Sequence, residues 1–194
     1  MIGGISTLQR QQSIRIERQG ANLWSMATVV VALGGSLLRP EVDERHNWLQ
    51  GLVKVIVASV ESGSKIALVV GGGAPAREGI ELAKPFIQDV AHLDRIGIAA
   101  TRLNATIVRE ALAEGGLAVS KKIPESIAGA NLELENCDVV VMGGTEPGHT
   151  TDAVAIDWRF KAGLGSVSLR LMSLASILKI PEIILKQNHS MILH

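Results

Sequence analysis

The chain has little cysteine, no excess charge of either sign and no long apolar run, and each shortage excludes a class of protein. Its single cysteine, Cys137, excludes a disulfide scaffold and any zinc or iron–sulfur site built from several thiolates. Nineteen basic side chains balance nineteen acidic ones, so the chain lacks the basic excess with which proteins coat nucleic acid or anionic membranes. The longest apolar run, residues 27–33, is far shorter than the roughly 20 residues that span a bilayer.

The composition that remains is typical of a globular protein. Hydrophobic residues make up 47% of the 194 positions, which excludes a disordered chain and is enough to build a buried core. The length fits one α/β domain of ordinary size. We therefore expect a soluble globular protein of a reducing compartment, the cytoplasm.

Three short runs rich in β-branched residues predict strands, and glycines follow each run at once. Apolar runs of this length without polar alternation are typical of parallel strands that are covered on both faces. The runs are residues 28–33 (TVVVAL) before Gly34 and Gly35, 66–70 (IALVV) before Gly71, Gly72 and Gly73, and 139–142 (VVVM) before Gly143 and Gly144.

The stretches between these runs have helical periodicity, which predicts helices over residues 41–60, 75–90 and 94–113. The alternation of strands and helices predicts a doubly wound α/β layer, in which ligands bind at the carboxyl ends of the strands. We expect the first helix to face the core with Trp48, Leu49, Leu52, Val55, Ile56 and Val60, and the third with Ile98, Leu103, Ile107 and Leu112.

The glycines after the three runs have a chemical interpretation and a simpler one. Without a Cβ, a strand-to-helix turn brings free backbone N–H groups and a helix dipole close to a phosphate. The simpler interpretation is that glycine closes the turns and binds nothing. Neither a Walker A pattern nor the G-x-G-x-x-G dinucleotide fingerprint occurs at these turns, so P-loop and Rossmann assignments have no support.

The segment 143–155, with the sequence GGTEPGHTTDAVA, is the strongest local signal. Thr150 or Thr151 begins a helix there, and Asp152 falls in its first turn, where a carboxylate is favoured. An ordinary turn before a capped helix is the alternative interpretation.

Four motifs together resemble those of the archaeal uridylate kinases, a branch of the amino acid kinase family. They are Leu33-Gly34-Gly35-Ser36, Val70-Gly71-Gly72-Gly73 with Arg77, Asp94-Arg95-Ile96-Gly97-Ile98 with Thr101-Arg102-Leu103-Asn104-Ala105, and the segment 143–155. The resemblance covers residues 28–155. It implies a three-layer α/β/α fold with a mainly parallel sheet, truncated in this chain. It also implies transfer of the γ-phosphoryl group of ATP to UMP, with Mg²⁺.

The resemblance also implies roles for individual residues. Competing interpretations make Arg77 a solvated helix residue and Asp94 a helix N-cap, and His149 is expected to contact the ligand rather than act as a general base. The resemblance places Gly34, Gly35, Ser36, Gly73 and Arg77 at ATP, and Gly72, Asp94, Thr145, Glu146, Pro147, Gly148, His149, Thr150 and Thr151 at UMP, with Asp94 at the ribose and Asp152 as the catalytic acidic residue.

The sequence departs from the family pattern in three places. Ala32 stands where many members have a lysine, so other cations must neutralise the phosphates. After Ala155 the expected strand, D-G-V-Y-type loop and adenine-binding lobe are not recognisable. Because other reading frames permit family-like strings there, we expect residues 156–194 to be an out-of-frame tail. Residues 1–25 are expected to be an extension from a wrong start or a flexible arm, which leaves 26–155 as the kinase-like core.

These departures affect the expected activity. The parent gene is expected to encode a UMP kinase, and the 194-residue chain to have weak or no turnover. Three alternatives stay open: a family member with another phosphate acceptor, a non-catalytic nucleotide- or anion-binding protein, and a fragment without a ligand. The family also implies a homo-oligomer, commonly a hexamer.

Overall fold

The computed structural model of the chain describes residues 28–38, 45–161 and 167–172. The elements alternate in type along the chain, as the sequence pattern predicts. They are β1 (Thr28–Leu33), the short 3-10 helix η1 (Gly35–Leu38), α2 (Arg45–Glu61), β2 (Lys65–Val70), α3 (Gly73–Ala83), α4 (Val90–Glu114), α5 (Ile127–Asn136), β3 (Val139–Met142), α6 (Thr151–Lys161) and β4 (Val167–Met172).

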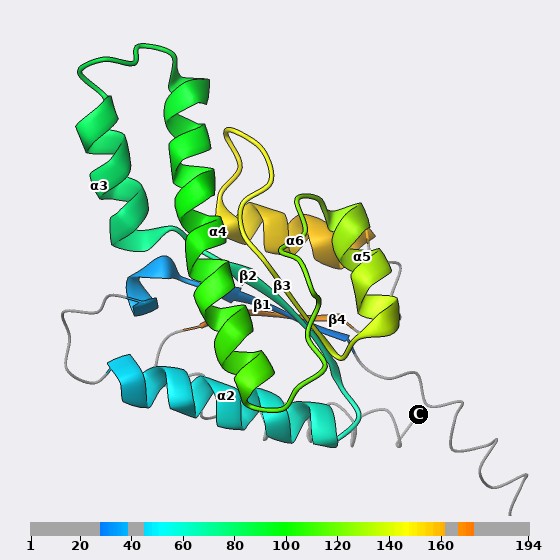
Figure 1. Ribbon diagram of the computed structural model, residues 1–194. Helices are drawn as coiled ribbons and strands as arrows, with labels where there is room; N and C mark the ends of the chain where they lie inside the picture. Colours follow the sequence, from blue (N-terminus) through cyan, green and yellow to red (C-terminus); the bar gives the residue numbers. More distant parts are fainter. Residues whose placement is uncertain (1–27, 39–44, 162–166, 173–194) are drawn as a thin grey trace, which may run out of the picture.

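The four strands form one parallel sheet in the order β3-β2-β1-β4. In the central pair, Thr28 stands opposite Lys65 and Leu33 opposite Val70. Helices α2 and α4 cover one face of this sheet, and α5 and α6 cover the other (Figure 1). The expected three-layer α/β/α fold is therefore confirmed.

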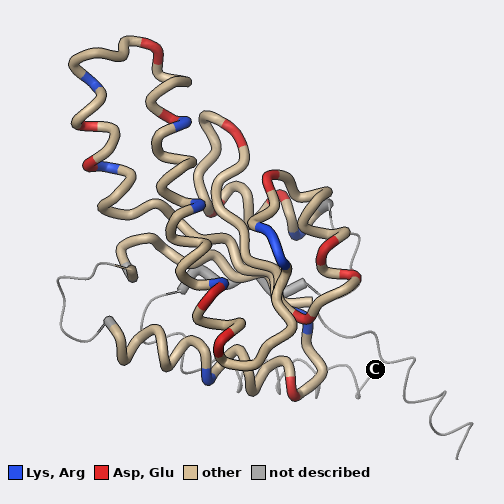
Figure 2. Tube along the Cα trace, in the orientation of Figure 1, with Lys and Arg blue, Asp and Glu red and all other residues tan. Residues whose placement is uncertain are grey.

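The alternation of side chains along each strand explains the three layers. Along β1, Val29 and Val31 point to a core made with α2 and α4, while Val30 and Ala32 point to a core made with α5 and α6. Strand residues that are buried on both faces have no place for polar side chains, which is why the runs read as continuously apolar. Charged residues accordingly lie mostly on the surrounding helices and loops (Figure 2).

The helix boundaries differ from the expected ones. The described part of the first helix begins at Arg45, and residues 39–44 lie outside the described part of the chain. Helix α3 ends at Ala83 instead of continuing to residue 90, and α4 begins at Val90 because Asp89 caps it. Helices α3 and α4 then pack together as a hairpin that projects beyond the sheet (Figure 1).

The face of α4 that packs on the sheet also differs from the expected one. Leu103 and Ile107 are 56% and 43% exposed, so their expected core position is wrong. The buried positions are mostly small or polar: Ala100, Thr101, Asn104, Ala105, Val108 and Leu112. Small residues allow this helix to approach the glycine turns closely, and larger side chains then remain for the outer face.

Two elements have no counterpart in the sequence-based expectation. Helix α5 follows Ser126, whose hydroxyl accepts a hydrogen bond from the N–H of Gly129 and so caps the helix. Strand β4 pairs with β1, although no strand is expected after Ala155. Helix α6 also continues past Ala155 and buries Trp158 completely in the second core.

Two further predictions concern residues that the structure does not describe. The extension over residues 1–25 and the last part of the tail, residues 173–194, lie outside the described residues.

Among the helices that the structure does describe, none combines the length and apolar character needed to cross a membrane.

Candidate active site

The three glycine turns lie at one edge of the sheet, because β1, β2 and β3 run parallel and each turn follows a strand's carboxyl end. This confirms that the glycines gather at one edge. Their surroundings differ from the expectation in one respect, since only the β2 turn leads directly into an α-helix. The β1 turn enters the short η1, and the β3 turn enters a loop that reaches α6 at Thr151.

The β1 and β2 turns are in backbone contact, which only glycine permits at two positions. A Cβ on Gly35 would lie 2.3 Å from the nitrogen of Gly73 and 2.4 Å from the carbonyl oxygen of Gly71. Gly73 has φ of +60°, and a Cβ there would lie 2.3 Å from the oxygen of Gly35. These distances are far inside van der Waals contact. The glycines therefore let the β1 and β2 turns adjoin without intervening side chains.

The loop after β3 is held by the carboxylate of Asp94. Its Oδ2 accepts a hydrogen bond from the N–H of Gly148, with a distance of 2.7 Å. Gly148 has φ of +82°, a conformation that favours glycine. The alternative interpretation of Asp94 as a helix N-cap is wrong, because Asp89 is the N-cap of α4 and accepts from the N–H of Ala91.

Helix α6 begins where the sequence predicts. The hydroxyl of Thr150 accepts a hydrogen bond from the N–H of Ala153 at 3.1 Å, which is the bond of a capping residue. Asp152 lies in the first turn of this helix, where the helix dipole favours a negative charge. Its side chain also lines the cavity beside the glycine turns.

A cavity of about 290 Å³, which we call the phosphate cavity, joins both turns to the start of α6. Every predicted ATP-binding residue lines it, together with the predicted catalytic residue. Arg77, an exposed residue of α3, places a positively charged side chain at this cavity. The lining residues are Gly34, Gly35, Ser36, Gly71, Gly72, Gly73, Arg77, Thr150, Thr151 and Asp152.

A second cavity of about 470 Å³, the central cavity, contains most of the predicted UMP-binding residues. Asp94 lies on its α4 side, and the loop after β3 forms the opposite wall. Gly72, Thr150 and Thr151 line both this cavity and the phosphate cavity, so the two adjoin there. The other lining residues are Ala76, Ile80, Gly97, Ile98, Thr101, Gly144, Glu146, Gly148 and His149.

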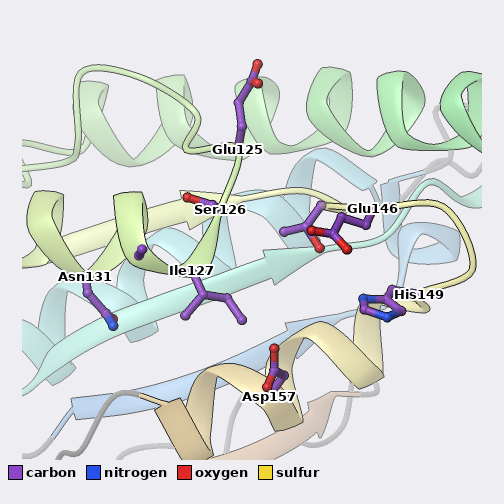
Figure 3. Close-up of a pocket in the computed structure, with 9 residues that line it drawn as sticks. Glu125, Ser126, Ile127, Asn131, Glu146, His149 and Asp157 are labelled. Carbon is purple, nitrogen blue, oxygen red and sulfur yellow. The ribbon is translucent and has the colours of Figure 1, made fainter.

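A third cavity, the side cavity, lies between the loop after β3 and helices α5 and α6 (Figure 3). It has a volume of about 340 Å³. Thr145 lines only this cavity, whereas Glu146 and His149 line it and the central cavity. Pro147 lines none of the three. Thr145 and Pro147 are therefore the two predicted UMP contacts that do not line the central cavity.

Two polar residues of the site have no assigned role in the sequence-based account. Thr101 and Asn104 belong to the motif TRLNA, and both are buried on the sheet side of α4. Asn104 contacts the β2 turn, and Thr101 contacts the β3 turn. Polar side chains in an otherwise apolar helix face are the signal that identifies such residues.

The described side chains offer no ready-made metal cage. Within the part of the chain that the structure describes, no three His, Cys, Asp or Glu residues are grouped to hold a metal ion. Asp152 is the acidic residue among those that line the phosphate cavity. One carboxylate beside a phosphate site fits Mg²⁺, which commonly takes one or two carboxylates and completes its coordination with phosphate oxygens and water.

Comparison with known sequences agrees with this architecture. The model of the amino acid kinase family matches residues 27–155. A uridylate kinase of Methanococcus maripaludis strain C5 is 40% identical over 127 residues, which cover 66% of this chain and 55% of that protein. The uridylate kinase of Methanocaldococcus jannaschii is 39% identical over the same length. The chain therefore spans about half the length of these relatives.

Solved structures of uridylate and UMP kinases have a similar fold. A crystal structure of uridylate kinase from Archaeoglobus fulgidus superposes with a TM-score of 0.63 at 37% identity, covering 73% of this chain and 61% of that one. UMP kinase from Bacillus anthracis superposes with a TM-score of 0.59 at 22% identity, over 75% and 65% of the two chains, which supports the fold alone. With its glycine turns, three-layer fold and family match over residues 27–155, the chain belongs to the amino acid kinase family.

Proposed function

We propose that the chain binds ATP and UMP and transfers the γ-phosphoryl group of ATP to UMP, giving UDP and ADP. One observation carries the proposal: the phosphate cavity and the central cavity share Gly72, Thr150 and Thr151. A phosphate donor in one cavity and an acceptor in the other would meet at this shared wall. The uridylate kinase relatives at 40% and 39% identity support UMP as the acceptor.

On the donor side, the proposal assigns the ATP phosphates to the phosphate cavity. Because Gly34, Gly35 and Gly73 have no side chains, a phosphate in this cavity could come close to their backbone. Arg77 offers positive charge, and Ser36 a hydroxyl. Since Ala32 stands where many family members have a lysine, Arg77 and Mg²⁺ carry the neutralisation of the phosphates in this chain.

On the acceptor side, the proposal assigns UMP to the central cavity. Asp94 would accept hydrogen bonds from the ribose hydroxyls. Thr150 and Thr151 place hydroxyl groups at the shared wall. Gly72 and the loop residues Glu146, Gly148 and His149 complete the contacts. Thr145 and Pro147 remain proposed UMP contacts. We infer that they contact UMP only if the loop after β3 adjusts, since neither lines the central cavity.

In the proposed reaction, an oxygen of the UMP phosphate bonds to the γ-phosphorus of ATP, and the bond to the bridging oxygen breaks so that ADP leaves. Mg²⁺ bound with ATP would neutralise charge on the phosphates. Asp152 lies in the phosphate cavity at the first turn of α6, where it would orient the cationic groups around the transferred phosphate. Most of the rate acceleration would come from alignment and charge neutralisation, which is general for phosphoryl transfer.

The experiment is a coupled assay of ADP release by the 194-residue chain with ATP, Mg²⁺ and either UMP or CMP. The proposal predicts release that depends on UMP. Asp152→Asn is expected to lower turnover about 100-fold or more while UMP still binds, because the lost charge acts on the transition state. Asp138→Asn is the matched control, since Asp138 precedes β3 at the opposite edge of the sheet. Equal turnover in both variants contradicts the role of Asp152.

Nucleotide binding without turnover is the second candidate, because the two cavities that would hold UMP and the ATP phosphates can bind these ligands without transfer between them. A rise in melting temperature with UMP, without UDP formation, identifies it. This candidate agrees with the prediction that residues 156–194 are out of frame and that turnover is weak. Resequencing the gene tests that prediction, which an intact single frame through this region contradicts.

Self-association in the cytoplasm completes the proposal. The exposed Leu103 and Ile107 lie four positions apart on the outer face of α4, where a second chain would cover them. Light scattering of the purified chain measures the oligomeric state. Leu103→Glu is expected to lower the molar mass if this face is the contact, and a monomeric parent protein contradicts this part of the proposal.

A further inference from the structure

Helix α4 presents two polar side chains to the glycine turns from the sheet side, and one of them, Thr101, also lines the central cavity. Asn104 is 2% exposed and Thr101 is 9% exposed. A buried polar group must find hydrogen-bond partners, or it destabilises the fold. Both side chains find theirs in the backbone of the turns that form the site.

Asn104 holds the β2 turn through two carbonyl groups. Its Nδ2 donates to the oxygen of Gly71 at 2.8 Å and to the oxygen of Gly72 at 3.0 Å. Because both partners are acceptors, only a side chain with two N–H donors satisfies them. Aspartate has the same shape but would place a carboxylate against two carbonyl oxygens.

Thr101 holds the β3 turn through its hydroxyl. The hydroxyl donates its proton to the oxygen of Ile98 at 2.6 Å, which leaves a lone pair for the N–H of Gly144 at 2.7 Å. Its methyl group, Cγ2, also lies 3.4 Å from the position that a Cβ on Gly72 would take. Thr101 therefore bonds to the β3 turn and lies beside Gly72 of the β2 turn.

We propose that Asn104 and Thr101 are positioning residues that fix the β2 and β3 turns relative to each other. This inference rests on the proposed function, in which Gly72 and Gly73 of the β2 turn and the loop after β3 hold the two substrates. The residues are three positions apart, so they lie on one face of one continuous helix. A shift of one turn against the other would misalign donor and acceptor phosphates, and a misplacement of about 1 Å costs roughly 100-fold in rate.

Thr101→Val removes the hydroxyl while keeping the shape of the side chain. We expect turnover to fall about 10- to 100-fold while dissociation constants of UMP and ATP change less than about threefold, because alignment is lost and the separate contacts remain. Thr101→Ser keeps the hydroxyl and is expected to restore turnover to within about threefold of the parent protein. Equal turnover in the valine variant and the parent overturns the role of Thr101.

Asn104→Asp tests the β2 turn in the same way, and Thr106→Val is the matched control. The hydroxyl of Thr106 donates to the oxygen of Arg102 within α4 and to no glycine turn. The proposal therefore predicts lower turnover for Asn104→Asp and unchanged turnover for Thr106→Val. An equal loss in both variants would show general destabilisation of α4 and overturn the role of Asn104.

Amide hydrogen exchange of the ligand-free protein measures positioning without any catalysis. In Thr101→Val, the N–H of Gly144 loses its acceptor, so we expect its exchange to accelerate at least about tenfold while amides of α2 keep their rates. Thr101→Ser is expected to keep the slow exchange. If the parent protein has no turnover, the proposed function fails, and this exchange measurement alone decides whether Thr101 holds the turn. Unchanged exchange at Gly144 overturns the proposal.

Discussion

Asp94 on α4 accepts a hydrogen bond from the backbone N–H of Gly148, with 2.7 Å between the carboxylate Oδ2 and the amide nitrogen. The bond joins the helix to the loop that carries most of the proposed UMP contacts. Both residues line the central cavity, the space assigned to UMP. Asp94 therefore has a structural role in the loop beside its proposed contact with the ribose.

Replacing Asp94 with alanine is expected to weaken UMP binding. The variant loses a hydrogen bond to a charged group at the proposed ribose position and also frees the loop, so the dissociation constant is expected to rise about 10- to 100-fold. Isothermal titration with UMP measures this change. ATP binding is expected to change less than about threefold, because the phosphate cavity does not contain Asp94.

Asp89→Ala is the matched control for this variant. Asp89 caps the same helix, five positions earlier, and lines none of the three cavities. Loss of the cap is expected to destabilise the protein by about 1 kcal/mol and to leave UMP affinity unchanged. Equal UMP affinity in the two variants contradicts the placement of UMP beside Asp94.

Gly35→Ala is expected to destabilise the protein strongly. Its Cβ would lie 2.3 Å from the nitrogen of Gly73, so the two turns must separate, at a cost of about 1–3 kcal/mol or more. Gly51→Ala has nothing within 4 Å of its Cβ and lies inside α2, where alanine is favoured by up to about 1 kcal/mol. Chemical denaturation measures the free energy of unfolding of both variants. A stable Gly35→Ala variant would contradict the close contact of the turns.

Trp158 offers a test of the fold beyond Ala155. It is fully buried, and its Nε1 donates to Oδ1 of Asn131 at 2.6 Å. Trp158→Phe is expected to destabilise by about 1–3 kcal/mol because it removes this hydrogen bond and part of a fully buried ring system. Trp48 is the control, since its buried Nε1 has no hydrogen-bond partner among the described residues, so Trp48→Phe loses no hydrogen bond. Denaturation experiments measure the free energy of unfolding of both variants. If Trp158→Phe lowers it no more than Trp48→Phe does, the result contradicts the packing of α6 described above.

The thiol of Cys137 is expected to react slowly. Burial raises its pKa, and the carboxylate of Glu133 raises it further. Because the thiolate is the reactive form, alkylation by iodoacetamide is expected to increase through a higher pH range in the folded protein than in denaturant. The raised pKa also makes the free energy of unfolding depend on pH. The contribution of the Cys137 thiol is complete below the pKa of the unfolded thiol, and it is lost as pH rises through the pKa of the folded thiol. Identical pH profiles in both states would contradict the raised pKa.

The strands and the glycine turns were predictable because their signals are local. Continuous apolar runs such as 139–142 occur where both faces of a strand are buried, and the glycines mark the ends of the strands. The start of α6 was predictable for the same reason, since Thr150 caps the helix two positions before Asp152. Parallel pairing then brings the three turns to one edge without further information.

The orientation of α4 could not be predicted from hydrophobicity. Leu103 and Ile107 have the apolar character of core residues, yet Ala105, Asn104 and Thr101 occupy the buried face because only short side chains fit against the turns. The roles of Thr101 and Asn104 depend on backbone groups 43 and 33 positions away. No local pattern identifies such partners. Two usable signals were missed: the cap at Ser126 before α5, and the alternation of apolar and polar residues along β4.

The most direct test of the central claim uses a ligand that joins the two substrates, a uridine and an adenosine linked by five phosphates. If the phosphate and central cavities meet at Gly72, Thr150 and Thr151, this ligand occupies both at once. The predicted result of titration calorimetry is a Kd at least about 100-fold below that of UMP or ATP alone, since the second contact becomes intramolecular. A Kd no lower than that of UMP, or mutual exclusion of UMP and ATP, would contradict the account.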